Sequence, residues 1–530
     1  MAPRSRIVLP LLLFACQAVA QSQPQPACPG GGCPPQLNEK TKRYANSTSG
    51  STPGVRALRA DITRAQSLYD ARDREAAGRL LDAVLRDPGF DALPAEDRRL
   101  AWAVLARVDM SAQRFERASE RLRRAIEAAD DDPDVWYWLA LNEDARGRHA
   151  SAAEAFTELA ERWPELLVNI DAGEVYRLQA ALPEDSPEKL AFLQTLFDAR
   201  WDDPGGDASF LWYHLARMRL ARGEIDAARA AARRIVQPGA IIAMRSDRRF
   251  DPIVDREAWA FNPTRAAERA VEALRAKVDG RPDDLDAKVQ FTYALLSAGD
   301  HAATIRLVDD ALAAPAPAAA SRGGDEADSR EQAQAWLLNN RAVALYRLGR
   351  AEEALADMER ARRLADKAGP NVSQTLNLGE MHCSFGRAED ARRMADAIDG
   401  GRTSDYGRMF QARVRLCAAW LSQDTKGMQR AFETIRKGRT HAQTIHLEAL
   451  VMLGRLDEAA QVLIGLLESP KERAATLEAL QQYREVEATP TLARLRVQRD
   501  ALLARDDVKA AIERVGRRER YDLYYGAGFD

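Results

Sequence analysis

The sequence predicts an all-α protein built from repeated pairs of helices. Large, small and turn-forming residues recur in one register along most of the chain, and the alternating polar and apolar runs of β-strands are absent. The 530 residues are 46% hydrophobic, which is enough for several compact units. Lys and Arg number 77 against 80 Asp and Glu, a formal net charge of −3, so we expect no nucleic-acid partner.

Residues 1–20 have the parts of a secretory signal peptide. Two arginines precede an apolar stretch from Ile7 to Ala15, and a run of small residues ends at Ala20. This stretch is too short to span a membrane, which takes about 20 apolar residues, and no later stretch reaches that length. We therefore predict an exported, periplasmic protein without a transmembrane segment.

The same segment has a second interpretation, as a bacterial lipoprotein signal. Cys16 follows Leu13, Phe14 and Ala15, and would then be the lipidated residue, although Phe14 is bulky for that pattern. A lipid would tether the protein to a membrane. The alternative locations are thus an outer-membrane lipoprotein or an extracellular protein.

Residues 21–54 are rich in Gln, Pro, Ser and Gly and hold almost no large apolar side chains. Such a segment buries too little surface to offset the entropy lost on ordering, so we predict a disordered linker. It contains Cys28 and Cys33, which an oxidising compartment favours as a disulfide closing a small loop. A metal or redox role is disfavoured because the spacing is not Cys-x-x-Cys and no His lies nearby.

From residue 55 the chain repeats. In one unit, Trp136 and Leu139 are expected to fill the space between two helices, Ala140 and Ala152 to let the backbones approach, and Gly147 to turn the chain. The full set of positions is Trp136, Leu139, Ala140, Gly147, Ala152, Phe156 and Pro164. This set resembles the tetratricopeptide repeat, with Glu143 where that family usually has an aromatic residue.

The same register recurs along the chain. Further units contain Ile62, Trp102, Trp212, Phe291, Leu338, Thr375, Leu416 and Leu447. Residues 164–206 are predicted to hold one degenerate helix pair with a turn between Pro183 and Pro187. We expect eight or nine pairs between about residues 55 and 470. The resemblance implies a superhelical solenoid that binds protein or peptide partners, without catalysis and without a cofactor.

Two segments interrupt the array. Residues 245–263 are rich in charged and aromatic side chains, and residues 313–330 form an Ala, Pro and Gly linker that we predict to be flexible and to separate two domains. The predicted organisation is N-terminal repeats at 55–312, with an insertion near 245–263, and C-terminal repeats at 331–470. Residues 471–530 are predicted to be a helical cap with an aromatic and basic tail.

The residues that usually perform chemistry form no recognisable site. His441 and His446 are five apart and so point to different faces of a helix, unlike the paired histidines of a zinc motif. Cys383 and Cys417 fall in first helices of repeats, where we predict small buried core residues. Nucleophile elbows, phosphate loops and dinucleotide-binding glycines are absent from the sequence. We therefore predict no metal, no cofactor and no enzymatic activity.

The resemblance places binding residues on the first helix of each pair. Carried over position by position, they are Tyr137, Leu141, Tyr213, Arg217, Trp336, Asn340, Val343, Arg347, Asn377 and Glu380. In the family, an Asn at the place of Asn340 and Asn377 often meets ligand backbone, and the alternative is a solvated amide. Trp336 is expected to offer an exposed indole to a partner, or else to pack on the 313–330 linker.

The sequence leaves three functions open. The first is a noncatalytic periplasmic adaptor that recruits peptides or proteins of a cell-envelope assembly in the groove between about Trp336 and Leu466. The second is a carbohydrate-processing accessory or enzyme with a site near 250–261, where Trp259 and Phe261 lie near Asp251 and Asp255. The third is a self-assembling structural spacer.

Overall fold

The computed structural model describes residues 53–202, 208–314, 325–366, 369–399 and 403–524. Their regular structure is helical except for one two-stranded antiparallel pair, β1 (Ala365–Asp366) with β2 (Gly369–Pro370). The predicted all-α class is thus confirmed. The signal peptide with Cys16, and residues 21–52 of the linker with Cys28 and Cys33, lie outside the described residues. Pro53 and Gly54, which were predicted to belong to the linker, are the first residues of α1.

The described chain divides into two compact units, which we call the N-terminal unit (residues 53–231) and the C-terminal unit (residues 232–524). This division corrects the boundary predicted at 313–330. Leu285 and Val308 before that segment share one core cluster with Leu337 after it. A stretch of Ala, Pro and Gly indicates a loop, but it does not show whether the helices on its two sides pack together.

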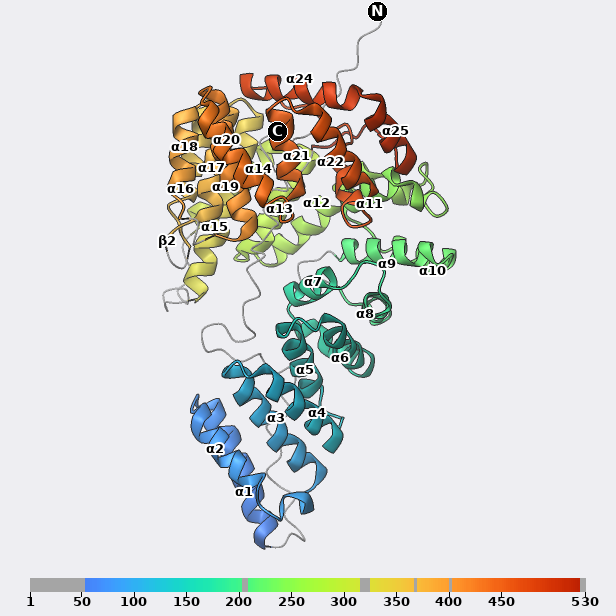
Figure 1. Cartoon of the computed structure of the whole chain (residues 1–530), viewed down its shortest axis with the longest axis vertical. Coiled ribbons are helices and arrows are strands. Elements are labelled where there is room, and N and C mark those ends of the chain that lie inside the picture. The colour runs from blue at the N-terminus through green and yellow to red at the C-terminus, as the bar shows by residue number, and fades with distance from the viewer. Residues whose placement is uncertain (1–52, 203–207, 315–324, 367–368, 400–402, 525–530) are drawn as a thin grey trace, which may run out of the picture. The chain divides into compact units, whose positions relative to one another are not determined.

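In the N-terminal unit, consecutive helices pack as hairpins: α1 with α2, α3 with α4, α5 with α6, and α7 with α8 (Figure 1). First helices also contact one another, α1 with α3 and α3 with α5. The bounds are α1 Pro53–Asp70, α2 Arg74–Val84, η3 Phe90–Ala92, α3 Ala95–Ser111, α4 Phe115–Ala128, α5 Pro133–Ala145, α6 His149–Arg162, η4 Pro164–Asn169, α7 Ala172–Ala181, α8 Pro187–Asp198, α9 Ser209–Ala221 and α10 Ile225–Ala232.

The α5–α6 hairpin shows why these residues form this motif. The Asp132 side chain accepts a hydrogen bond from the backbone N–H of Asp134 at 3.0 Å and so caps α5. Gly147 turns the chain with φ +71°, a left-handed conformation that glycine adopts without steric cost. One prediction is corrected: Trp136 is only half-buried, and Trp138 is the indole that the hairpin buries.

In the C-terminal unit, α13 packs with α14, α15 with α16, α17 with α18, α19 with α20, and α21 with α22. The bounds are α11 Pro238–Ser246, η5 Arg248–Phe250, η6 Trp259–Phe261, α12 Pro263–Gly280, α13 Leu285–Ala298, α14 His301–Ala313, α15 Asp325–Arg347, α16 Ala351–Ala361, α17 Val372–Ser384, α18 Ala388–Asp396, α19 Asp405–Leu421, α20 Thr425–Lys437, α21 Gln443–Met452, α22 Leu456–Glu468, α23 Arg473–Ala479, α24 Pro490–Ala504 and α25 Asp506–Val515.

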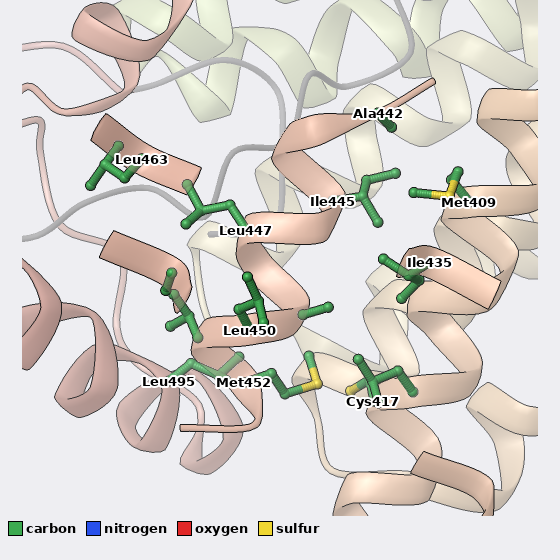
Figure 2. Packing of buried hydrophobic residues seen from close by; sticks show 14 of the residues in the cluster. Met409, Cys417, Ile435, Ala442, Ile445, Leu447, Leu450, Met452, Leu463 and Leu495 are labelled. Carbon is green, nitrogen blue, oxygen red and sulfur yellow. The ribbon is translucent and has the colours of Figure 1, made fainter. Parts of the chain in front are cut away.

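One extended core cluster of this unit joins α17 through α25. Figure 2 shows Met409 and Cys417 of α19 facing Ile445 and Met452 of α21, with Leu463 of α22 on the other side of α21. Apolar contacts between successive hairpins of this kind stabilise a repeat array, because no single hairpin can bury its apolar face alone.

The C-terminal segment corrects the prediction of a simple cap. Helices α24 and α25 do pack on α21 and α22. Residues 516–524, however, run back through the unit: Gly516 bridges Asp247, and Gln482 bridges Arg520. The backbone N–H of Gln482 donates to the carbonyl of Glu519 at 3.0 Å. The tail therefore packs against distant segments of the C-terminal unit, with Tyr521 and Leu523 buried.

None of the helices in the described ranges combines the length and the apolar character that crossing a membrane requires.

Candidate functional site

The positions predicted to line a groove do lie on first helices, but their side chains are covered. Five are buried: Tyr137, Tyr213, Arg217, Asn340 and Val343. Five are half-buried: Leu141, Trp336, Arg347, Asn377 and Glu380. The expectations of exposed amides and an exposed indole are therefore corrected, and the contacts below give the physical reason.

Tyr137 connects α5 to α7. Its hydroxyl donates a hydrogen bond to Oε2 of Glu174 at 2.7 Å. Burial raises the pKa of Tyr137, and the neighbouring Glu174 carboxylate raises it further. Burial also raises the pKa of Glu174. The pair is an internal tie between neighbouring hairpins.

Arg217 holds the turn that precedes α8. Its Nη1 donates to Oδ1 of Asp185 at 2.8 Å, and its Nη2 donates to the carbonyl of Glu184 at 2.8 Å and to Oε2 of Glu184 at 2.9 Å. Lys189 donates to the other oxygen of the same carboxylate at 2.7 Å. Burial opposes ionisation of Glu184, but His214 and Lys189 outweigh it and hold the pKa of Glu184 below its usual range.

Asn340 and Asn377 belong to one ladder of amides across α17, α15 and α13. Asn377 donates to Oδ1 of Asn339 at 3.1 Å, Asn339 donates to Oδ1 of Asn340 at 3.2 Å, and Asn340 donates to the hydroxyl of Thr292 at 2.7 Å. The sequence did not single out Asn339, the residue that joins the other two. The amide groups are thus hydrogen-bonded to one another and to Thr292.

Glu380 lies in a buried ionic triad. It pairs with Arg413, and Nη1 of Arg413 lies 3.1 Å from Oε2 of Glu448. The three residues come from α17, α19 and α21, which are successive first helices. An ion pair this well covered is costly to break, because the partner charge stays buried.

Arg347 contacts the chain's own tail. Its Nη1 donates to the carbonyl of Leu296 at 3.0 Å, and its guanidinium lies 4.8 Å from the ring centroid of Tyr524. The ring of Tyr524 lies 4.9 Å from His301, and burial lowers the pKa of His301 to about 4. A residue predicted to meet a partner is thus covered by residues 516–524.

The interruption at 245–263 is joined to the same tail. Asp251 accepts two hydrogen bonds from Arg517, at 2.8 and 2.7 Å, and one from Arg256 at 2.6 Å. Phe261 is buried, and Trp259 is exposed with Arg269 4.4 Å above its ring. Asp251, one of the two carboxylates of the predicted alternative site, therefore has a structural role here.

Within the described part of the chain, no group of three His, Cys, Asp or Glu side chains is arranged to hold a metal ion. Cys383 and Cys417 are both buried free thiols in the C-terminal core, as predicted. Burial raises the pKa of the Cys383 thiol, which makes this sulfur a poor nucleophile.

A cavity of about 410 Å³ opens between the turn of α3–α4 and the turn of α5–α6. We call it the arginine pocket. It is lined by Gln113, Arg114, Phe115, Glu116, Arg117, Arg146 and Arg148. The residues of this pocket are not among the binding positions predicted from the sequence. Its only signal was an arginine at the same place in two successive repeats, Arg114 before α4 and Arg148 before α6.

The pocket has an excess of positive charge, since four guanidinium groups and one carboxylate line it. Arg114 contacts Oδ1 of the buried Asp109 at 2.7 Å, and Arg146 pairs with Glu116. Arg148 is 3.6 Å from Glu116. Exposed guanidinium groups at this density attract anions, most strongly at low salt.

No family model and no curated protein matches the chain. Among solved structures, NprR in complex with its cognate peptide NprX is 11% identical, with a TM-score of 0.35, over 80% of this chain and all of that one. The P58(IPK) TPR domain is 15% identical, with a TM-score of 0.19, over 78% of this chain and all of that one. Yeast Tom70 is 12% identical, with a TM-score of 0.23, over 86% of this chain and 99% of that one.

The class of the protein follows from its own hairpins. They succeed one another in sequence and bury the repeat positions Leu139, Ala140, Ala152 and Phe156. The protein is therefore an all-α array of helix hairpins, and its repeat positions resemble those of the tetratricopeptide repeat.

Proposed function

We propose that the protein is a noncatalytic scaffold that binds a protein or peptide partner as an adaptor of a cell-envelope assembly. Stacked hairpins present an extended surface that suits a partner chain. The observation that carries the proposal is the arginine pocket, where Arg114, Arg117 and Arg148 remain about half exposed beside a cavity. The inner polar residues, by contrast, are engaged in internal contacts.

The proposed location is the periplasm. It rests on the arginines, apolar stretch and small-residue ending of residues 1–20, with a lipid tether at Cys16 as the alternative. Fractionation of the source organism distinguishes the two locations, because a lipidated chain sediments with membranes and is released by detergent.

The test is chemical crosslinking of the full chain in the source organism, followed by purification and identification of the crosslinked proteins. We expect a reproducible protein adduct whose partner, once purified, binds saturably and is recovered unaltered. Recovery of the chain without any protein adduct, or chemical change of the bound partner, would contradict the proposal.

A further inference from the structure

We infer that the arginine pocket binds an acidic segment of a protein partner through its side-chain carboxylates. The inference rests on the proposed scaffold function and names the chemistry of the partner. It starts from the lining of the pocket, which has four guanidinium groups against one carboxylate. Arg114, Arg117 and Arg148 have 48%, 56% and 55% of their side-chain surface exposed.

Other hairpins neutralise an arginine at such a turn in two ways: Arg387 before α18 pairs with Glu352 of the preceding hairpin, and two further arginines pair within their own helix. Arg350 precedes α16 and pairs with Glu353 at 2.6 Å, and Arg455 precedes α22 and pairs with Glu458 at 2.6 Å. In both cases the carboxylate comes three residues later, on the same helix.

The pocket departs from this pattern in both of its hairpins. Three residues after Arg114 the chain has Arg117, and three residues after Arg148 it has Ser151. The carboxylate that pairs with Arg350 and with Arg455 in their own helices is thus replaced by a second arginine or by a hydroxyl. Two arginines that face one cavity without this local partner favour a carboxylate supplied from outside.

The carboxylates already near the pocket are shared among several arginines. Asp109 contacts Arg114 at 2.7 Å, pairs with Arg121, and lies 3.7 Å from Arg117. Glu116 pairs with Arg146 and lies 3.6 Å from Arg148, and the buried Glu143 also contacts Arg146, at 2.7 Å. Arg117 and Arg148 are therefore farther from a carboxylate, at 3.7 and 3.6 Å, than Arg114 is at 2.7 Å. Their guanidinium groups are the ones that a ligand would bind.

A peptide suits the site better than a lone small anion because of its size and its lining. The cavity extends between two hairpins, and it includes the half-buried ring of Phe115, which offers apolar contact beside the charges. An extended chain with several Glu or Asp residues would meet arginines from both turns at once.

The experiment measures binding of a fluorescent octaglutamate peptide to the full mature chain by anisotropy, with octaglutamine as the neutral peptide. The test variant is Arg117→Gln/Arg148→Gln. The control variant is Arg392→Gln/Arg436→Gln, which removes the same charge from side chains that are 58% and 50% exposed. Circular dichroism melting checks that all chains are folded.

We expect saturable binding of octaglutamate that weakens with salt, and no binding of octaglutamine. The test variant should bind about 10-fold more weakly, which corresponds to about 1.4 kcal/mol, whereas the control variant should bind like the original chain. A further variant, Arg117→Glu/Arg148→Glu, should lose octaglutamate and bind octalysine.

Three results would overturn the inference: no binding of octaglutamate, equal weakening in test and control variants, or tighter binding of inorganic polyphosphate that the test variant loses. The last result would assign the pocket to phosphate. If crosslinking in cells captures the same partner with the original chain and with the test variant, this inference fails while the scaffold function stands.

Discussion

At the scale of single residues, the polar side chains of the first helices act as ties between neighbouring hairpins. The amide ladder from Asn377 through Asn339 and Asn340 to Thr292 crosses three helices, and so does the triad of Glu380, Arg413 and Glu448. Buried polar groups must be paired to be tolerated, so these contacts fix how one hairpin sits on the next.

Replacement of Arg413 by Met should lower the free energy of unfolding of the C-terminal unit by about 3–5 kcal/mol, because Glu380 and Glu448 would be left buried without their counter-charge. Arg415→Met on the same helix is the control. Arg415 is 43% exposed and pairs with Asp396 at 3.0 Å, so its loss should cost less than about 1 kcal/mol. Urea unfolding measures the free energy of unfolding of both variants. Equal losses would contradict the structural role given to the triad.

Glu478 makes stability depend on pH. Burial raises the pKa of Glu478 to about 7, so the folded state holds a proton that the unfolded state loses near pH 4.5. This residue's contribution to stability therefore falls as the pH rises from about 4.5 to 7.

Glu478→Gln should remove that dependence and make the protein more stable than the original chain at pH 8, by roughly 1–2 kcal/mol. The exposed Glu485, replaced in the same way, is the control. Unfolding is measured at pH 5 and pH 8. A difference between variant and original that does not grow with pH would refute this explanation.

The candidate site shows that the position of a residue in the sequence does not reveal which side chains it contacts. The sequence correctly placed Tyr137, Arg217, Asn340 and Glu380 on first helices. It did not reveal that their partners, such as Glu174 for Tyr137 and Thr292 for Asn340, come from other helices at the right distance. The arginine pocket was missed for the same reason, since arginines in turns resemble ordinary solvated charges until two hairpins are stacked.

At the scale of elements, each hairpin described above except α7–α8 has one residue with positive φ between its helices. Gly349 has φ +75°, and a Cβ there would meet no atom within 4 Å, so the backbone conformation alone decides the effect of a substitution. The predicted turn glycine Gly147 adopts this conformation. Because the turn needs such a residue, glycines at regular spacing indicated the positions of the repeats in the sequence.

Gly349→Ala should lower stability by about 1 kcal/mol because alanine disfavours positive φ. The same substitution at Gly465 should instead raise stability by about 0.5–1 kcal/mol, since Gly465 lies within α22 and its Cβ would also find open space. Thermal unfolding compares the two. A shift of the same sign in both variants would contradict the role given to the turn.

The tail is the element that the sequence described least well. Leu523 is buried in a cluster with Ile242 and Tyr483, far away in sequence. Its aromatic and basic composition predicted a cap on the last repeat or a contact with a partner, because composition alone does not show which distant backbone a segment pairs with.

Leu523→Ala should destabilise the C-terminal unit by about 2–4 kcal/mol through loss of buried apolar contact. The exposed Arg520 of the same segment, changed to Ala, should have an effect within about 0.5 kcal/mol. Denaturant unfolding followed by tryptophan fluorescence reports both. A tolerated Leu523→Ala would mean that the tail is not part of the core.

At the scale of the whole molecule, two compact units carry one kind of repeat. The repeat class could be predicted because every hairpin makes the same local demands on its sequence. The division near residue 231 could not, since the segment at 313–330 resembles a linker although the helices on its two sides share a core. The division follows from tertiary packing, which no local pattern records.

The most direct test of the account is site-specific photocrosslinking in the source organism. A photoreactive amino acid is placed at Gln113, on the edge of the arginine pocket, and separately at Val497, which is 65% exposed. We predict one protein adduct at Gln113, lost in the Arg117→Gln/Arg148→Gln background, and no such adduct at Val497. Absence of any protein adduct at Gln113 in a folded chain, or the same adduct at both positions, would contradict the account.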